Sequence, residues 1–126
     1  MVKNTAQKET DNWQTPKWLM KVFSEFYDPV PPNYDKDYMS TDVADKRQIY
    51  INPPYSNPLP FVLKAIEDHK KCPNNVIVLL LKFDSTTKWY KALVDAEAHF
   101  LYCAERLHYS ESGAAPFSSV LAILSD

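Results

Sequence analysis

Two kinds of apolar spacing alternate along this chain. Runs with the β-branched or uniformly apolar pattern of strands lie at residues 47–51, 75–81, 98–102 and 119–124, with a shorter candidate at 107–109. Segments with apolar side chains at helical spacing lie at residues 16–26, at residues 56–71 and from residue 84 onward. This alternation predicts an α/β fold in which helices cover a sheet.

The run from Val76 to Leu81 is apolar at every position, which is typical of a strand buried on both faces. Such strands occur in parallel sheets that carry helices on both faces. The last predicted strands follow one another without a helix between them, so we expect an antiparallel pair at the C-terminal end. The predicted sheet is therefore mostly parallel, with that antiparallel pair as its last part.

The composition indicates a single domain. Residues 1–12 are polar and are expected to form a flexible arm, while residues 13–126 are expected to form one domain, because 45% of the chain is hydrophobic. No run of eighteen apolar residues is present, so we expect no membrane-spanning helix. Cys72 and Cys103 lie far apart and are expected to be free thiols in a reducing cytoplasm.

Charge and glycine content narrow the candidate chemistry. The formal net charge of -2 argues against a strongly basic surface for nucleic acid, although it leaves room for a small basic face. Gly113 is the only glycine, so a glycine-rich phosphate or dinucleotide loop is excluded. The cysteines and histidines show no metal-ligand spacing, so no metal site is expected.

The segment Asn52-Pro53-Pro54-Tyr55 joins a predicted strand to a predicted helix. Open α/β sheets bind their ligands at the carboxyl ends of strands, where this turn lies. The prolines fix the backbone, so the amide and the phenol are held at set offsets. The Asn52 Oδ1 atom and the Pro53 carbonyl can accept hydrogen bonds from both N–H groups of a planar amine, while Tyr55 stacks on its ring. The turn therefore suits methyl transfer to a planar amine, and a plain proline-rich connection is the alternative interpretation.

The chain resembles the phage Dam-type N6-adenine DNA methyltransferases, which depend on S-adenosylmethionine. The motifs that carry the resemblance occur in order at Asp11–Pro16, Asp28-Pro29, Asn52–Ser56, Thr87–Trp89, Arg106–Tyr109 and Ala115–Ser118. The resemblance implies a reduced Rossmann-like methyltransferase sheet. It also implies a viral or prophage enzyme that methylates a flipped adenine of duplex DNA in the host cytoplasm.

The same resemblance implies roles for individual residues. The catalytic turn is matched by Asn52, Pro53, Pro54 and Tyr55. The cofactor site is matched in two places, at Asp28 and Pro29 and at Thr15 and Pro16. Two plainer roles stay open, since Asp28 can bond its own backbone in a turn and Thr15 can cap a helix.

The chain also departs from the family pattern. About twenty residues separate Asp28 from the strand before the catalytic turn, which is too few for the two βα units expected there. Those units usually supply an acid that holds the cofactor ribose, and the candidates to replace it are Asp35, Asp37, Asp42 and Asp45. The chain has no insertion for target recognition, so we expect a homodimer on DNA.

Two other functions remain open from the sequence. The same turn suits other planar NH2 groups, namely cytosine N4, an RNA adenine or a protein glutamine. A non-catalytic binding subunit of the same fold would account for the missing glycine loop and the short sheet.

Overall fold

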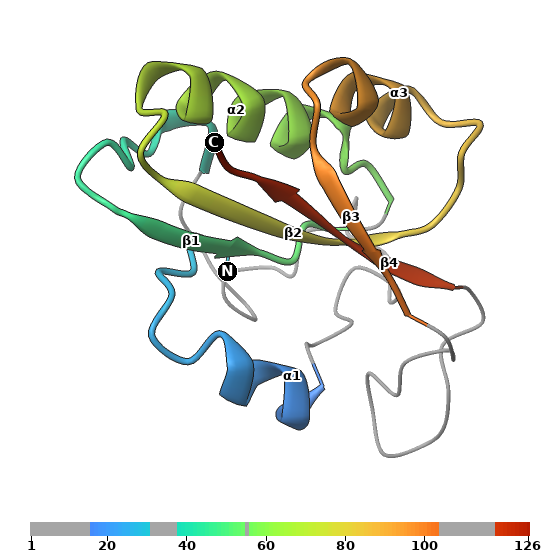
Figure 1. Ribbon diagram of the computed structural model, residues 1–126, viewed down its shortest axis with the longest axis horizontal. Coiled ribbons are helices and arrows are strands. Elements are labelled where there is room, and N and C mark those ends of the chain that lie inside the picture. The colour runs from blue at the N-terminus through green and yellow to red at the C-terminus, as the bar shows by residue number, and fades with distance from the viewer. Residues whose placement is uncertain (1–15, 31–37, 55, 104–117) are drawn as a thin grey trace, which may run out of the picture.

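The computed structural model describes residues 16–30, 38–54, 56–103 and 118–126 of the chain. These residues form one sheet with helices on either side of it (Figure 1). In chain order the elements are α1 (Lys17–Val22), the 3-10 helix η2 (Tyr38–Ser40), β1 (Gln48–Ile51), α2 (Leu59–Lys71), β2 (Val76–Lys82), α3 (Lys88–Asp95), β3 (His99–Tyr102) and β4 (Ser119–Leu124). The predicted α/β class is confirmed.

The sheet has the strand order β1-β2-β4-β3. β1 and β2 are parallel, whereas β4 is antiparallel to both β2 and β3. It follows that β1, β2 and β3 run in one direction and β4 in the other, so the predicted mostly parallel arrangement holds for strand direction. The predicted antiparallel pair is confirmed as β3 and β4. Because β4 lies between β2 and β3, the parallel pairing among the named strands is that of β1 with β2.

Helices cover both faces of the sheet, as predicted. Figure 1 shows α2 and α3 on one face and α1 on the other. The alternation of strand side chains explains this arrangement. Ile49 and Ile51 pack in a core cluster with α2 and α3, whereas Tyr50 packs with Leu19 of α1. β2 is apolar along its length because it contributes to both clusters.

A further extended segment lies beside β1. Tyr27 forms an isolated parallel bridge with Ile49. The Tyr27 amide donates to the Gln48 carbonyl, and the Tyr50 amide donates to the Tyr27 carbonyl, each at 2.9 Å. This segment before Asp28 therefore runs in the same direction as β1.

The first helix is shorter than predicted. α1 ends at Val22 rather than Phe26, and its N-cap is Pro16, so Pro16 is not the first helical residue. The predicted apolar stripe is only partly buried. Leu19 is 3% exposed, whereas Trp18 is 58% exposed, so α1 contacts the core through a narrow face.

The later helices begin beyond their predicted starts. α2 begins at Leu59 with Pro58 as its N-cap, so neither Ser56 nor Asn57 caps it. The prolines of this loop set its backbone instead of a capping side chain. α3 begins after Thr87, whose hydroxyl accepts a hydrogen bond from the amide three residues later.

Several other predictions can be compared with the described ranges. Within them, no helix is long and apolar enough to cross a bilayer, and no group of side chains is placed to hold a metal ion. Cys72 and Cys103 are free thiols, as predicted. The predicted arm at 1–12 and the strand candidate at 107–109 lie outside the described residues.

Candidate active site

The predicted catalytic turn leaves the sheet at the carboxyl end of β1. Pro53 is buried, and Asn52 and Pro54 are half-buried. The Asn57 amide donates to the Pro54 carbonyl at 3.4 Å, which turns the chain toward α2. Tyr55, predicted to stack on the target ring, lies outside the described residues. The turn is thus held at its expected place on the fold, directly after a buried strand.

The Oδ1 atom of Asn52 is buried in this structure. An acceptor in such a place is poorly hydrated, so a hydrogen bond that it makes to an amine is stronger than one in water. Burial also means that the target amine reaches Oδ1 only after the side chain or its covering atoms move. The geometry therefore suits a site that is completed when substrate enters.

The acid-containing turn predicted for the cofactor lies beside the catalytic turn. Tyr27 pairs with Ile49 in parallel, so Asp28 and Pro29 follow the sheet in the same direction as Asn52 and Pro53. The carboxyl ends of parallel neighbours meet at one edge of a sheet. The structure therefore brings together two motifs that lie about twenty residues apart in the sequence, at the edge where such sheets bind ligands.

Asp28 is held in a local turn. Its Oδ1 accepts a hydrogen bond from the Val30 amide at 2.9 Å. Burial raises the pKa of the Asp28 carboxyl, and the Val30 hydrogen bond opposes this rise. Pro29 and Val30 are both buried. The turn that was the plainer alternative for Asp28 is therefore present, and a half-buried carboxyl at a ligand-binding edge remains available for a second role.

The N-terminal part of the predicted cofactor site is only partly described. Thr15 lies outside the described residues, and Pro16 is buried at the start of α1. The Pro16 carbonyl accepts hydrogen bonds from the amides of Leu19 and Met20. The end of α1 is held under β1, since the Phe23 ring stacks on Tyr50 with centroids 4.8 Å apart. Pro16 therefore belongs to a segment that packs beneath the strand of the catalytic turn.

Four acids were candidates to bind the cofactor ribose in place of the missing unit. The two of them that the structure describes are exposed to solvent. The Asp42 Oδ1 atom accepts from the Ala44 amide at 2.9 Å in an exposed turn. Asp45 is exposed and lies 3.7 Å from the Lys46 ammonium. Asp35 and Asp37 lie outside the described residues. Neither of the two described acids sits at the edge formed by Asn52 and Asp28.

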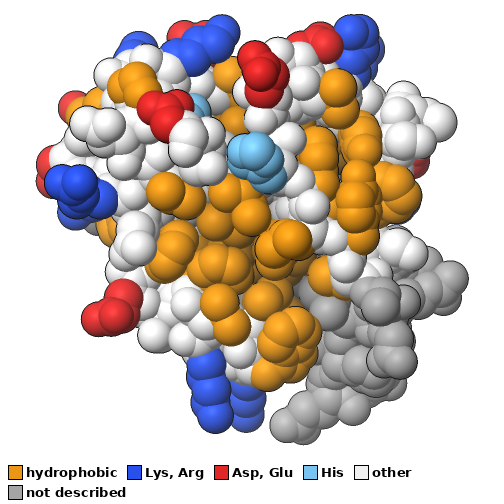
Figure 2. Space-filling model, in the orientation of Figure 1, with side chains coloured by type: hydrophobic (Ala, Val, Ile, Leu, Met, Phe, Trp, Pro, Cys, Tyr) orange, Lys and Arg blue, Asp and Glu red, His pale blue; other side chains and the backbone are white. Residues whose placement is uncertain are grey.

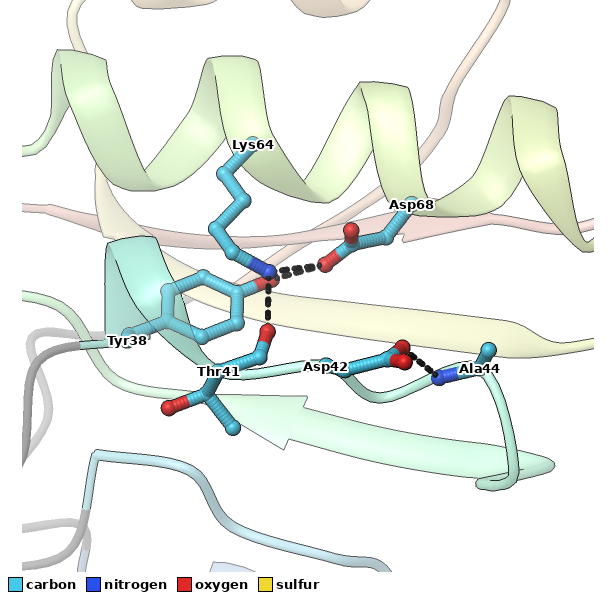
Figure 3. A network of polar contacts seen from close by, with 6 residues as sticks. All are labelled: Tyr38, Thr41, Asp42, Ala44, Lys64 and Asp68. Atoms are coloured by element: carbon cyan, nitrogen blue, oxygen red, sulfur yellow. Dashed lines mark hydrogen bonds and ion pairs between the residues drawn. The ribbon is translucent and has the colours of Figure 1, made fainter.

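A partly buried polar network, which was not predicted from the sequence, holds this segment against α2 (Figure 3). The Asp68 Oδ2 atom accepts from the Tyr38 hydroxyl at 2.9 Å and from the Lys64 ammonium at 2.8 Å. The Lys64 ammonium also donates to the Thr41 carbonyl at 2.8 Å and lies 4.1 Å from the centre of the Tyr38 ring. The four-residue spacing of Lys64 and Asp68 was the available signal.

An open groove of about 770 Å³ runs beside this network. It is lined by Met39, Ser40, Thr41, Asp42, Ala44, Pro60, Leu63, Lys64, Glu67, Asp68, Lys71 and Cys72. The groove follows the flank of α2 and includes no residue of the Asn52 or Asp28 turns. The groove carries charges of both signs, and Lys64 and Asp68 at its centre form an ion pair. The polar network therefore mainly holds the 38–46 segment in place.

A group of neighbouring aromatic side chains is the other feature that was not predicted from the sequence. They lie where β2 and β3 end and α3 begins, and they are Phe83, Tyr90, Phe100 and Tyr102. Phe100 and Tyr102 alternate along β3, so they share one face of the strand. That spacing was the available signal.

Comparisons with known proteins agree with the predicted resemblance. A family model described as DNA N-6-adenine-methyltransferase (Dam) matches residues 24–119, which include the Asp28 and Asn52 turns but not Thr15 or Pro16. A DNA N-6-adenine-methyltransferase of Haemophilus phage HP1 (strain HP1c1) is 32% identical over 114 residues, covering 79% of this chain and 65% of that protein. One from Escherichia phage T1 is 28% identical over 142 residues, covering 92% of this chain and 57% of that protein.

The chain thus spans less than two thirds of the length of either curated relative. No solved structure matched the chain.

Proposed function

Because this chain belongs to the DNA N-6-adenine-methyltransferase (Dam) family, we propose that it transfers a methyl group from S-adenosylmethionine to the exocyclic amine of adenine in DNA. One observation carries the proposal. The family match includes both the Asn52 turn and the Asp28 turn, and the Tyr27 bridge puts these turns at one edge of the sheet. A phage or prophage enzyme acting in the cytoplasm of its host fits the curated relatives, which come from phages.

The chemistry follows from the acceptors of the catalytic turn. The amine of adenine is a poor nucleophile because its lone pair is delocalised into the ring. Hydrogen bonds to Asn52 Oδ1 and the Pro53 carbonyl favour a more tetrahedral nitrogen, whose lone pair is then free to attack. Tyr55 is proposed to stack on the base and fix its plane. Positioning and fixed dipoles supply the rate gain, so no general base is required in the turn.

The residues present suit S-adenosylmethionine, which when bound supplies the electrophilic methyl group. Asp28 offers a half-buried carboxyl, and partly buried carboxylates bind amino or hydroxyl donors strongly. Pro29, Thr15 and Pro16 are the other proposed cofactor contacts. The Rossmann-like methyltransferase fold is supported by the common direction of β1, β2 and β3, the reversed β4, and the helices on both faces.

The proposed substrate is duplex DNA with a flipped adenine, because the turn has to reach an amine that lies inside the base stack. We also propose that the chain acts as a homodimer on DNA. Its small size and formal net charge of -2 leave one copy with few cations to place against phosphates.

The test is transfer of labelled methyl groups to DNA, RNA and protein in parallel reactions. We expect label in DNA, recovered as N6-methyladenine after digestion. Label recovered as N4-methylcytosine, in RNA or in glutamine would keep the chemistry and change the substrate. Absence of transfer together with no binding of S-adenosylmethionine in calorimetric titration would replace the enzyme with a non-catalytic binding subunit.

A further inference from the structure

The aromatic side chains at the ends of β2 and β3 form a compact group, which we call the aromatic corner and define as Phe83, Tyr90, Phe100 and Tyr102. The rings of Tyr90 and Phe100 stack, with centroids 5.1 Å apart and planes 4° apart. The Phe83 ring lies edge-on to Tyr102 at 5.2 Å and is 5.6 Å from Tyr90. Four rings from the loop after β2, from α3 and from β3 therefore lie against one another.

Most of the aromatic corner is not part of the hydrophobic core. Phe100 packs against the core cluster of α2 and α3, but Phe83, Tyr90 and Tyr102 are not among the side chains of either core cluster. Tyr102 is 57% exposed and Phe83 is 37% exposed. Exposing aromatic rings to this extent is unfavourable in hydrophobic free energy. A cluster of exposed rings therefore indicates a ligand-binding surface.

The hydroxyl groups of the corner hold the rings in place. The Tyr90 and Tyr102 hydroxyl oxygens lie 3.1 Å apart across α3 and β3. Hydrogen bonding with Tyr102 raises the pKa of the Tyr90 phenol, so the Tyr90 hydroxyl stays uncharged at neutral pH. An uncharged and fixed aromatic surface suits a flat ligand that stacks, and it does not repel an anionic one.

The corner lies at the same edge of the sheet as the catalytic turn. Ile51 pairs with Leu79, and two residues further along β2, Leu81 pairs with Val120, which pairs with Tyr102. Tyr102 is therefore close to the level of Asn52, displaced sideways by the three strand spacings from β1 to β3. At about 4.8 Å each, these spacings amount to about 14 Å. That distance is the length of about four stacked nucleotides.

The charges next to the corner are compatible with a nucleic acid strand. Lys82 and Lys88 are exposed on either side of the loop that carries Phe83. Asp84 is in the same loop, where its Oδ1 accepts hydrogen bonds from the amide and hydroxyl of Thr86. Residues 82–95 contain three lysines and two aspartates, so this segment is net positive by one charge although the chain is net negative.

We propose that Phe83, Tyr90 and Tyr102 form a stacking surface for an unpaired nucleobase of the DNA strand that carries the target adenine. The ligand is a base a few nucleotides from the target, bound through its face and not through its hydrogen-bonding edge. Every base has such a face, so the surface contributes affinity without sequence preference. The proposal rests on the proposed function for its choice of DNA, but it concerns binding and not methyl transfer.

The test uses a fluorescein-labelled single strand of about twelve thymidines and a matched strand with abasic sites at its centre. Neither strand contains adenine, so binding is measured by anisotropy without any methyl transfer. We expect the wild-type protein to bind the thymidine strand more tightly than the abasic strand. We expect Tyr102→Ala to bind the thymidine strand about tenfold or more weakly, the range found when one stacking ring is removed.

Leu101→Ala is the matched control. Leu101 is 58% exposed and precedes Tyr102 on the same edge strand, but its side chain faces the other side of the sheet. This control should keep wild-type affinity, and Tyr102→Phe, which keeps the ring, should lose little. Melting temperatures of all variants in this test, including Tyr102→Ala, show whether each is folded. Phe83→Leu keeps an apolar side chain without an aromatic face and should behave as Tyr102→Ala does.

Three results would overturn the stacking surface. Tyr102→Ala and Leu101→Ala could weaken binding equally, or the wild-type protein could bind the abasic strand as tightly as the thymidine strand. A third is that Tyr102→Ala changes only the oligomeric state in light scattering, which would make the corner a protein interface. If methyl transfer to DNA fails while the Tyr102 effect is found, the proposed function falls and the stacking surface remains.

Discussion

At the scale of single residues, Asn52 lies where the buried sheet meets the candidate site. The preceding residue, Ile51, is fully buried in the core, and the following residue is a buried proline. The backbone at Asn52 is therefore held by packing on both sides. A change confined to this side chain should leave the fold in place, so its effect on transfer can be measured separately.

Replacing Asn52 with alanine should remove one acceptor for the target amine and leave the Pro53 carbonyl. We expect methyl transfer in single-turnover assays to fall by about 100-fold or more, as when one fixed polar group is removed from a transition state. Affinity for S-adenosylmethionine should change little. Asn52→Asp keeps an acceptor oxygen and should retain part of the activity.

Asn57→Ala is a suitable control for the Asn52 variants, because Asn57 is an exposed amide in the same loop. It should keep wild-type turnover and melting temperature. Unchanged turnover in Asn52→Ala would show that the turn is a plain connection between β1 and α2. Equal losses of turnover and stability in Asn52→Ala would point to the same conclusion.

Asp28→Asn should separate cofactor binding from stability. Burial raises the pKa of the Asp28 carboxyl above its ordinary value, so the folded protein binds a proton there more tightly than the unfolded chain does. The carboxyl therefore favours folding at low pH, and this contribution is lost as pH rises through the raised pKa. The asparagine Oδ1 atom can still accept from the Val30 amide, so the variant should melt at a higher temperature than wild type at pH 7.

The same variant lacks the carboxylate charge, so its affinity for S-adenosylmethionine should fall by about tenfold or more in calorimetric titration. The gain in melting temperature should shrink toward about pH 3, where the wild-type carboxyl is protonated as well. Asp42→Asn is the control, since Asp42 forms a similar turn with Ala44 in an exposed place. Wild-type cofactor affinity in Asp28→Asn would remove Asp28 from the proposed site.

At the scale of elements, the strands were predicted better than the helices and loops. The four strand runs were found within one or two residues because a buried strand has to be apolar where the core covers it. The start of α2 was missed because Pro58 is its N-cap and supplies no capping side chain, and the start of α3 was missed because Thr87, three residues after the predicted start, caps it. Polar residues before a helix predict a cap only when the backbone brings them to its first turn.

The candidate site shows the same division. The position of the Asn52 turn could be predicted, because a motif directly after a strand has its place on the sheet fixed by that strand. The proximity of this turn to Asp28 could not be predicted, because it depends on the Tyr27–Ile49 bridge, which pairs segments distant in the sequence. The Tyr38–Asp68 contact was missed for the same reason, since its partners lie thirty residues apart. Tyr38 is fully buried, whereas the nearby Asp42 and Asp45 are exposed.

Asp68 should be the residue that holds the 38–46 segment on α2. Asp68→Ala leaves the buried Tyr38 hydroxyl and the Lys64 ammonium without their shared acceptor. We expect the free energy of unfolding, measured with urea, to fall by about 2–3 kcal/mol. Asp95→Ala breaks an ion pair with Lys91 at the same four-residue spacing, but that pair is exposed, and it should cost at most about 0.5 kcal/mol. Equal losses in the two variants would show that the network adds nothing beyond a surface pair.

At the scale of the whole molecule, the charge of the chain bears on the proposed binding of DNA. The chain has fourteen lysines and arginines against sixteen aspartates and glutamates. Figure 2 shows basic side chains at the α1 end and mixed signs on the side of α2 and α3. A single copy therefore has a small basic surface, and nonspecific affinity for a duplex grows with the number of phosphates that are neutralised.

We expect the complex with DNA to contain two copies of the chain, because a second copy doubles the phosphate contacts without changing the net charge of either surface. Light scattering of the complex should give two chains per duplex. The logarithm of the binding constant should fall with the logarithm of salt concentration about twice as steeply on this duplex as on one short enough for a single chain. The short duplex is the control, and it should also bind more weakly. Full methyl transfer with one chain per duplex would contradict the dimer. A single copy would then make all the contacts with DNA, and the basic surface near α1 and the aromatic corner would have to bind the same strand.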